Sequence, residues 1–220
     1  MVKRSAIFAA ACVVLAAAVA AAPSAPRYAL PASVVTLIVD GSGIREFAAN
    51  LRHDADAALA GPAMPADEAR RWLGLSVHLA LLAGVDVKAQ AAAERLRELQ
   101  PDPAVRAYTG VTTHALCVVR RSGGGSDAAA FGREFARRLA ELPRTTEMRD
   151  VLERQRARSA ALTAESVHAD ASVLAARVGT APHVDVATAD EIIRLRHRLV
   201  DLVPLRAVTL AALDAAIREL

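Results

Sequence analysis

Two short stretches of the chain share an arrangement of residue types that is typical of a binding site or of tight helix packing. In each stretch an aromatic residue is followed two positions later by Gly, and four positions after that by His. The stretches are "WLGLSVH", from Trp72 to His78, and "YTGVTTH", from Tyr108 to His114. An imidazole can bind a metal ion or carry a proton near neutral pH, and an aromatic ring supplies a large apolar contact. Trp72, His78, Tyr108 and His114 are therefore our candidate binding residues.

Packing is the alternative explanation of the same pattern. Gly within a helix costs about 1 kcal/mol relative to Ala. Its occurrence at both equivalent positions, Gly74 and Gly110, therefore indicates that a neighbouring backbone approaches closely there. The two histidines would then lie at the border of an apolar stripe, where the ring packs and a ring nitrogen finds a backbone or water partner. Packing explains the repetition better, and a binding site stays open as the second interpretation.

A third His lies at a spacing that places two metal ligands on one helix face. Glu165 and His168 are three residues apart. Di-metal sites of this kind need a second Glu-x-x-His and further carboxylates from facing helices, and the chain contains no second copy. We keep Glu165 and His168 only as the site of an alternative, metal-dependent enzyme. The principal interpretation includes no cofactor and no catalytic residue.

The run "LIVDGSG" over residues 37–43 is the one segment with the composition of a strand followed by a turn. Asp40 at the end of such a strand would be a candidate metal ligand or nucleophile, but that arrangement needs a parallel sheet. No succession of strand, helix and strand follows, so a short extended segment leading into a helix is expected. The chain also contains no Gly-x-Ser-x-Gly, His-Glu-x-x-His or phosphate-loop motif.

Helices must therefore position all of these side chains. From about residue 42 to the end, apolar residues recur with the helical period of 3.6, as Trp72, Leu75, Leu79 and Leu82 illustrate. This pattern predicts an all-α domain over 42–220. Short connections make neighbouring helices antiparallel. The expected architecture is thus a set of antiparallel helical hairpins, arranged as a repeat or as an irregular bundle.

Turn residues and helix caps set the expected boundaries. Pro103 follows Asp102 and occupies the first helical position, where its missing N–H costs nothing. The other expected N-caps are Ser42, Asp86, Ser126, either Thr145 or Thr146, and Thr188. After a linker over 23–41, the expected units are a helix over 43–60, hairpins over 66–101 and 102–143, a long helix over 146–178 and a C-terminal hairpin over 188–220.

The two hairpins can be overlaid on each other. Gly74 and Gly110 are 36 residues apart, the closing residues Pro101 and Pro143 are 42 apart, and the segments end "ERLRELQP" and "ARRLAELP". With small Ala residues in the second helix, residues 66–143 resemble tetratricopeptide-like repeats. The distance from Gly to the closing Pro, 27 and 33 residues, departs from the family pattern. The resemblance implies a concave surface that binds protein or peptide partners and has no catalysis of its own.

The N-terminus predicts export. Lys3 and Arg4 precede an apolar run over 6–22, which reads as a secretory signal peptide cleaved near Ala21 and implies a periplasmic or secreted protein without stable membrane insertion. The formal net charge of +3 falls to +1 once the two basic residues are removed, which disfavours a nucleic-acid partner. Cys117 is then the only cysteine, and its apolar neighbours predict a buried thiol.

The sequence thus favours an exported all-α interaction or accessory module, and it favours a binding protein over an enzyme. The metal-dependent enzyme using Glu165 and His168 is one alternative. The other is that these helices assist the catalytic part of a longer secreted hydrolase. The sequence does not indicate the oligomeric state.

Overall fold

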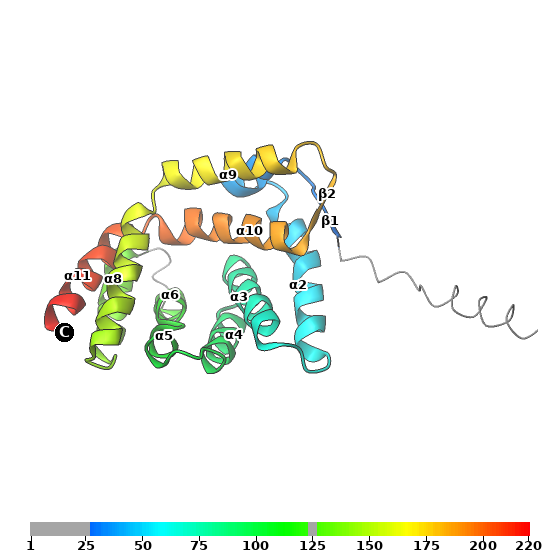
Figure 1. The fold of residues 1–220 in the computed structure, drawn as a ribbon. Helices are drawn as coiled ribbons and strands as arrows, with labels where there is room; N and C mark the ends of the chain where they lie inside the picture. The colour runs from blue at the N-terminus through cyan, green and yellow to red at the C-terminus, as the bar shows by residue number, and fades with distance from the viewer. Residues whose placement is uncertain (1–26, 123–126) are drawn as a thin grey trace, which may run out of the picture.

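A computed structural model describes residues 27–122 and 127–220, and it is all-α, as the helical period predicted (Figure 1). The predicted signal peptide over 1–22 and the predicted cap Ser126 lie outside the described residues. The α-helices are α2 (Ile44–Ala60), α3 (Ala66–Leu82), α4 (Asp86–Glu98), α5 (Pro103–Tyr108), α6 (Val111–Arg121), α7 (Ala128–Ala140), α8 (Thr146–Ala161), α9 (Ala164–Val178), α10 (Val186–His197) and α11 (Arg206–Glu219).

Residues 27–43, before α2, are part of the folded domain, which corrects the predicted linker over 23–41 as far as the residues are described. Strand β1 (Arg27–Ala29) pairs antiparallel with β2 (His183–Asp185), and Tyr28 faces Val184. The strand predicted in "LIVDGSG" is instead a π-helical turn, η1 (Thr36–Asp40). Its Leu37 and Ile38 are fully buried. In a strand these adjacent side chains would point to opposite faces, whereas a helical turn lets both be buried in one core. The turn ends at Gly41, which adopts the left-handed conformation.

Two predicted helices are each divided in two. The first helix of the hairpin expected over 102–143 is interrupted after Tyr108, because Gly110 adopts φ +89° and starts α6 as its N-cap. Asp102 caps α5 as predicted, accepting hydrogen bonds from the amides of Ala104 and Val105. The region 102–143 is consequently three helices, α5, α6 and α7, rather than a hairpin of two.

The long helix expected over 146–178 ends at Ala161 and restarts at Ala164. Leu162 leaves the helical conformation with ψ 101°, and Thr163 caps α9. Thr163 and Ser166 form a capping box, in which each side chain accepts a hydrogen bond from the backbone N–H of the other residue. Of the other predicted caps, Ser42 is replaced by Gly43 and Thr188 by Asp185.

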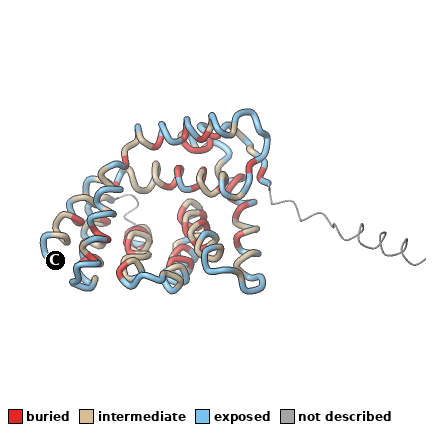
Figure 2. Tube along the Cα trace, in the orientation of Figure 1, coloured by how far each residue is buried: buried red, intermediate tan, exposed pale blue. Residues whose placement is uncertain are grey.

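The buried residues form two hydrophobic cores (Figure 2). The first core, defined by the residues buried between α3 and the helices α4, α5, α6, α7, α8 and α11, includes Phe131, Phe135 and Leu213. The second core lies among β1, η1, α2, α3, α9, β2 and α10, and it includes Phe47 and Ile193. Figure 2 shows the outer side of α9 exposed and its inner side buried.

Helix α3 is the wall shared by both cores. Leu73 and Val77 are buried in the first core, whereas Leu75 and Leu79 are buried in the second. Two separate parts of the sequence form the second core: β1, η1 and α2 first, and later α9, β2 and α10. Figure 1 shows α10 between α9 and α3.

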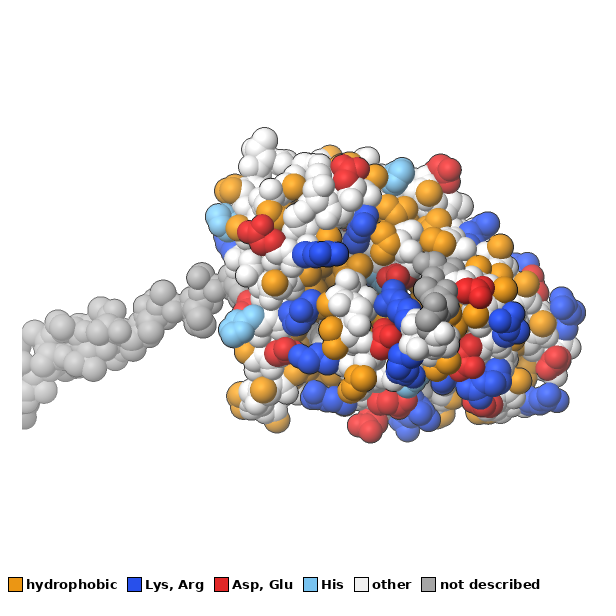
Figure 3. Space-filling view, turned by 180° about the vertical axis from the view of Figure 1, so that it is seen from behind, with side chains coloured by type: hydrophobic (Ala, Val, Ile, Leu, Met, Phe, Trp, Pro, Cys, Tyr) orange, Lys and Arg blue, Asp and Glu red, His pale blue; other side chains and the backbone are white. Residues whose placement is uncertain are grey.

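The surface carries both signs of charge. Figure 3 shows basic and acidic side chains interspersed on one face of the molecule, without a broad area of one sign. Among the described residues no helix is both long enough and apolar enough to cross a membrane. Cys117 is fully buried, as predicted, and burial raises the pKa of its thiol to about 11.

Candidate functional site

Trp72 lies in a surface cleft between the first turns of α3 and α10. The cleft has a volume of about 310 Å³ and is lined by Glu68, Arg71 and Trp72 from α3 and by Val186, Ala187, Asp190 and Arg194 from α10. The indole is half-buried and packs against the second core. Asp190 and Arg194 form an ion pair of 2.9 Å, and burial raises the pKa of Asp190. The cleft thus combines an apolar floor with charged sides.

His78 lies further along the same interface, where its ring packs against that of His197. The ring centroids are 4.9 Å apart and the planes are tilted by 30°. The Nδ1 atom of His78 is buried and has no hydrogen-bond partner among the described residues. Burial lowers the pKa of His78 well below its ordinary value of 6.5, and the charges of His197 and Arg194 lower it further. His78 is accordingly neutral at physiological pH.

Beyond the two histidines a chain of charged groups continues to α6 and α4. His197 Nδ1 is 2.7 Å from Asp201 Oδ2. Arg120 donates a hydrogen bond to the other carboxylate oxygen of Asp201, and its Nη1 donates to the carbonyl of Leu81 at 2.9 Å. Asp86 Oδ1 lies 3.8 Å from Arg120. This polar chain, His78–His197–Asp201–Arg120–Asp86, connects α3, α10, α6 and α4.

A π-helical turn, η2 (Arg198–Leu202), carries Asp201 at the point where α10 ends. A π-turn contains one residue more per turn than an α-helix, and it changes the direction of the side chains that follow. Here it holds Asp201 within reach of both His197 and Arg120. Leu202, which packs against both cores, lies in the same turn.

The polar chain contains an imidazole that is hydrogen-bonded to a carboxylate, which fixes the orientation of the ring. It does not have the arrangement of a nucleophilic catalyst. Among the described residues no hydroxyl or thiol is hydrogen-bonded to His197, and the Sγ of Cys117 points at the carbonyl of Asp86, 3.7 Å away. The geometry is that of a buried polar contact between the cores, with the hydrogen bond between His197 and Asp201 at its centre.

The second pair of candidate residues lies at a different interface. Tyr108 is half-buried against the first core, and burial raises its pKa to about 12. His114 Nε2 is 2.9 Å from Glu94 Oε1 of α4. Burial lowers the pKa of His114, and the carboxylate of Glu94 partly opposes that shift. The structure therefore does not bring Trp72 and His78 together with Tyr108 and His114 in one groove.

The two glycines of the similar stretches also have different roles. A Cβ on Gly74 would meet no atom within 4 Å, so the expected close approach of another backbone does not occur there. Gly110 is needed for its positive φ, and a Cβ there would lie 3.1 Å from the ring of His114. A close contact between helices occurs at a different glycine, Gly132 of α7, where a Cβ would lie 3.1 Å from the side chain of Val208 of α11.

Glu165 and His168, the residues of the metal alternative, are both exposed on α9. A hydrogen bond from the backbone lowers the pKa of Glu165, as is usual in the first turn of a helix. Within residues 27–122 and 127–220 there is no group of three His, Cys, Asp or Glu side chains that could hold a metal ion. Asp40, His53 and His183 are exposed as well.

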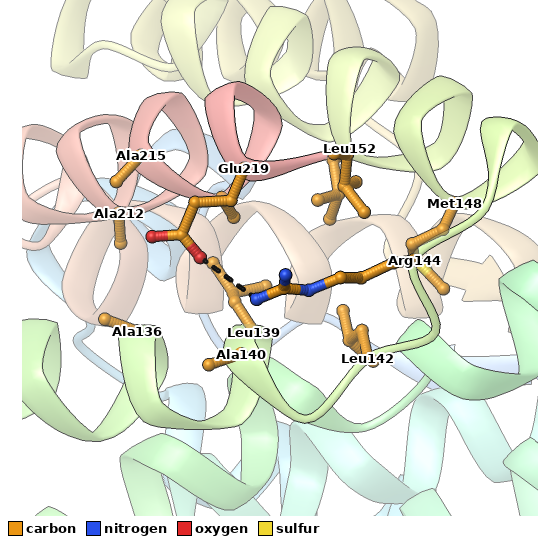
Figure 4. Close-up of a pocket in the computed structure, with 12 residues that line it drawn as sticks. Ala136, Leu139, Ala140, Leu142, Arg144, Met148, Leu152, Ala212, Ala215 and Glu219 are labelled. Carbon is orange, nitrogen blue, oxygen red and sulfur yellow. Dashed lines mark ion pairs between the residues drawn. The ribbon is translucent and has the colours of Figure 1, made fainter.

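Near the C-terminus a smaller hollow of about 90 Å³ lies between α7, α8 and α11 (Figure 4). Its wall is apolar, with Leu139 from α7, Leu152 from α8 and Ala212 from α11. Arg144 and Glu219 point toward each other across it, with their charged atoms 3.8 Å apart. The hollow is large enough for a few water molecules only.

Most members of the polar chain were not predicted from the sequence. The spacing of four residues between His197 and Asp201 places them on one helix face, and it was the one signal that could have found them. Arg120 and Asp86 gave no local signal, because Arg120 contacts Asp201 across 81 positions of the sequence.

Comparison with protein-family models, with curated protein sequences and with solved structures gave no significant match for this chain in any of the three. The helical fold is compatible with a helical repeat, and no family match supports the tetratricopeptide resemblance.

Proposed function

We propose that the protein is an exported interaction module that binds a peptide segment of a partner protein in the cleft between α3 and α10. The observation that carries this proposal is the position of Trp72, half-buried in the floor of a 310 Å³ cleft with charged groups on its sides. Trp is the residue type most enriched among those that dominate binding energy at protein interfaces. The helices on both sides of the cleft are fixed by the second core, so the site is preformed.

The lining of the cleft defines the chemistry of the partner. Trp72, Val186 and Ala187 offer an apolar surface for one large apolar side chain of the peptide. Arg71 lies on one side, with Glu68 beside it, and neither has an ion-pair partner among the described residues. A peptide with an apolar residue flanked by an acidic and a basic residue would complement both charges.

The α3–α4 hairpin is the part of the chain to which we apply the tetratricopeptide-like resemblance. It consists of two antiparallel helices with Ala89, Ala92 and Ala93 buried in the second, a feature that supports close packing of such a hairpin. Export rests on the apolar run over 6–22 behind Lys3 and Arg4. N-terminal sequencing of the mature protein tests export, and an uncleaved Met1 would contradict it.

Photo-crosslinking tests the binding site. A photoreactive amino acid is placed at Arg71, beside the cleft, and the protein is crosslinked in the cells that produce it. We expect a discrete crosslinked partner that disappears when Trp72→Ala is added. The matched control carries the photoreactive residue at Arg133, which is exposed on α7 outside the cleft. A pattern of products that is the same at both positions, or that survives Trp72→Ala, would overturn the proposal.

Fluorescence gives an independent measurement, because Trp72 is the only Trp of the chain. A peptide identified from the crosslinked partner should change the emission of Trp72 with a saturable titration curve. Charge reversal at Arg71 should weaken binding, and the same reversal at Arg133 should not.

A further inference from the structure

A second and larger cavity lies between the start of α2 and the end of α10, apart from the Trp72 cleft. Its volume is about 920 Å³, which is at the upper end of the range for small-molecule sites. The walls come from four segments: the Gly41–Gly43 turn, the first half of α2, the end of α3 at Leu82 and Ala83, and Arg196 with Val200.

Three guanidinium groups and one carboxylate line this cavity. The basic residues are Arg45, Arg52 and Arg196, and the acidic one is Glu46. Arg45 and Arg52 form no ion pair with any described residue, and the Nε of Arg52 is buried without a hydrogen-bond partner. The wall therefore carries guanidinium groups that no described carboxylate neutralises through an ion pair.

Arg196 is held in place by the backbone of η1. Its Nη1 donates hydrogen bonds to the carbonyls of Ile38 and Val39, at 3.0 and 2.8 Å. Burial lowers the pKa of Arg196, and the charges of Asp201 and Asp40 oppose that shift. The guanidinium remains charged, and it is oriented before any ligand arrives.

The backbone beside these side chains adds further donors. Gly41 and Gly43 adopt φ +78° and +79°, and a side chain on either would meet Arg196 or Pro31 at 3.0 Å or closer. Helix α2 starts at this turn without a side-chain cap. The amides of Arg45 and Glu46 in its first turn consequently have no acceptor among the described residues.

We propose that this cavity binds a small molecule through its phosphate group. Guanidinium groups bind phosphate with two parallel hydrogen bonds, and three of them around one cavity match a group with more than one negative charge. The volume exceeds that of phosphate alone, so the ligand carries an organic part that contacts Leu82 and Val200. The phosphate belongs either to a soluble compound or to a lipid headgroup.

Pyrophosphate serves as the probe, and the protein used is the mature full chain. In ¹H–¹⁵N NMR spectra we expect saturable shifts of the Arg52 Nε–H and of the backbone amides of Arg45 and Glu46. Arg52→Gln and Arg45→Gln should each raise the Kd for pyrophosphate at least tenfold. Arg45 is exposed, so its variant keeps the fold even if Arg52→Gln does not.

Arg133→Gln is the matched control, because it removes the same charge from an exposed position on α7. Sedimentation with phosphatidylglycerol vesicles, compared with phosphatidylcholine vesicles, distinguishes the two sources of phosphate. Sedimentation that is lost in Arg45→Gln assigns a lipid headgroup, and pyrophosphate binding without sedimentation assigns a soluble compound. The absence of saturable shifts, or equal weakening by Arg133→Gln, would overturn the proposal.

Discussion

Gly74 and Gly110 occupy equivalent positions in two similar stretches, yet substitution by Ala should have opposite effects. Gly74 lies within α3 with open space around it, so Gly74→Ala should stabilise the protein by about 1 kcal/mol through helix propensity. Gly110 has a positive φ and would place a Cβ against His114, so Gly110→Ala should destabilise it by about 1–2 kcal/mol. Urea unfolding of both variants measures the two effects. Equal signs would contradict this account.

His78 should make the stability of the protein dependent on pH. Because burial holds its pKa below 6.5 in the folded state, the unfolded chain binds more protons as the pH falls through that value. The stabilisation is complete above about pH 6.5, and it is lost progressively at lower pH. We expect the free energy of unfolding to decrease from pH 7 to pH 5, and His78→Gln to reduce that decrease.

The control for this pH dependence is His168→Gln, which removes an exposed imidazole from α9. Its pH profile should follow that of the unmodified protein. A slope that is unchanged in His78→Gln, measured by urea unfolding at each pH, would show that His78 is not responsible.

At the scale of the element, the break between α8 and α9 depends on its capping box. Thr163→Ala removes the side-chain acceptor for the amide of Ser166 and should cost about 1 kcal/mol. Thr180→Ala, at an exposed position in the loop after α9, should have little effect. Thermal or urea unfolding of the two variants provides the measurement, and equal losses would show that the cap does not hold this break.

The same break shows what the sequence could and could not predict. Helical periodicity continues through residue 162, so a single helix over 146–178 was the reasonable expectation. Leu162, however, is buried in the second core, while Met148 and Leu152 of α8 are buried in the first. The break separates the two groups: the buried residues of α8 all lie in the first core, and those of α9 all lie in the second. Tertiary packing therefore favours a break here, and its one local signal is the N-cap Thr163 with Ser166 three residues later.

Local signals were sufficient where a residue acts on its own neighbours. Asp102 caps α5, and Pro103 occupies the first helical position, as predicted. The burial of Cys117 followed from its apolar neighbours. The similarity of the two aromatic-Gly-His stretches was misleading as a guide to structure, because the positive φ of Gly110 divides a helix where Gly74 continues one.

At the scale of the whole molecule, the polar chain joins the two hydrophobic cores. Arg120 comes from α6, in the first core, and Asp201 from the turn that follows α10, in the second. The pair is separated by 81 residues, so only the fold brings it together. The many apolar residues of α3 indicate that this helix is buried on more than one side. No feature of the sequence indicates the charged contact between the cores.

Arg120→Met should destabilise the protein on the order of 3 kcal/mol, because it leaves Asp201 and the carbonyl of Leu81 without their shared partner. The side chains of Arg120 and Asp201 are only 24% and 12% exposed, so water cannot replace the lost contacts well. Arg137→Met removes an exposed arginine that pairs with Glu134 and Glu141 nearby in the sequence, and it should change stability little.

A double-mutant cycle tests the pair directly. Asp201→Asn should cost less in the Arg120→Met background than in the unmodified protein, because Asp201 has already lost its cation there. Urea unfolding of the unmodified protein, the two single variants and the double variant completes the cycle. Strictly additive losses in the free energy of unfolding would mean that Arg120 and Asp201 stabilise their own cores independently and do not join them.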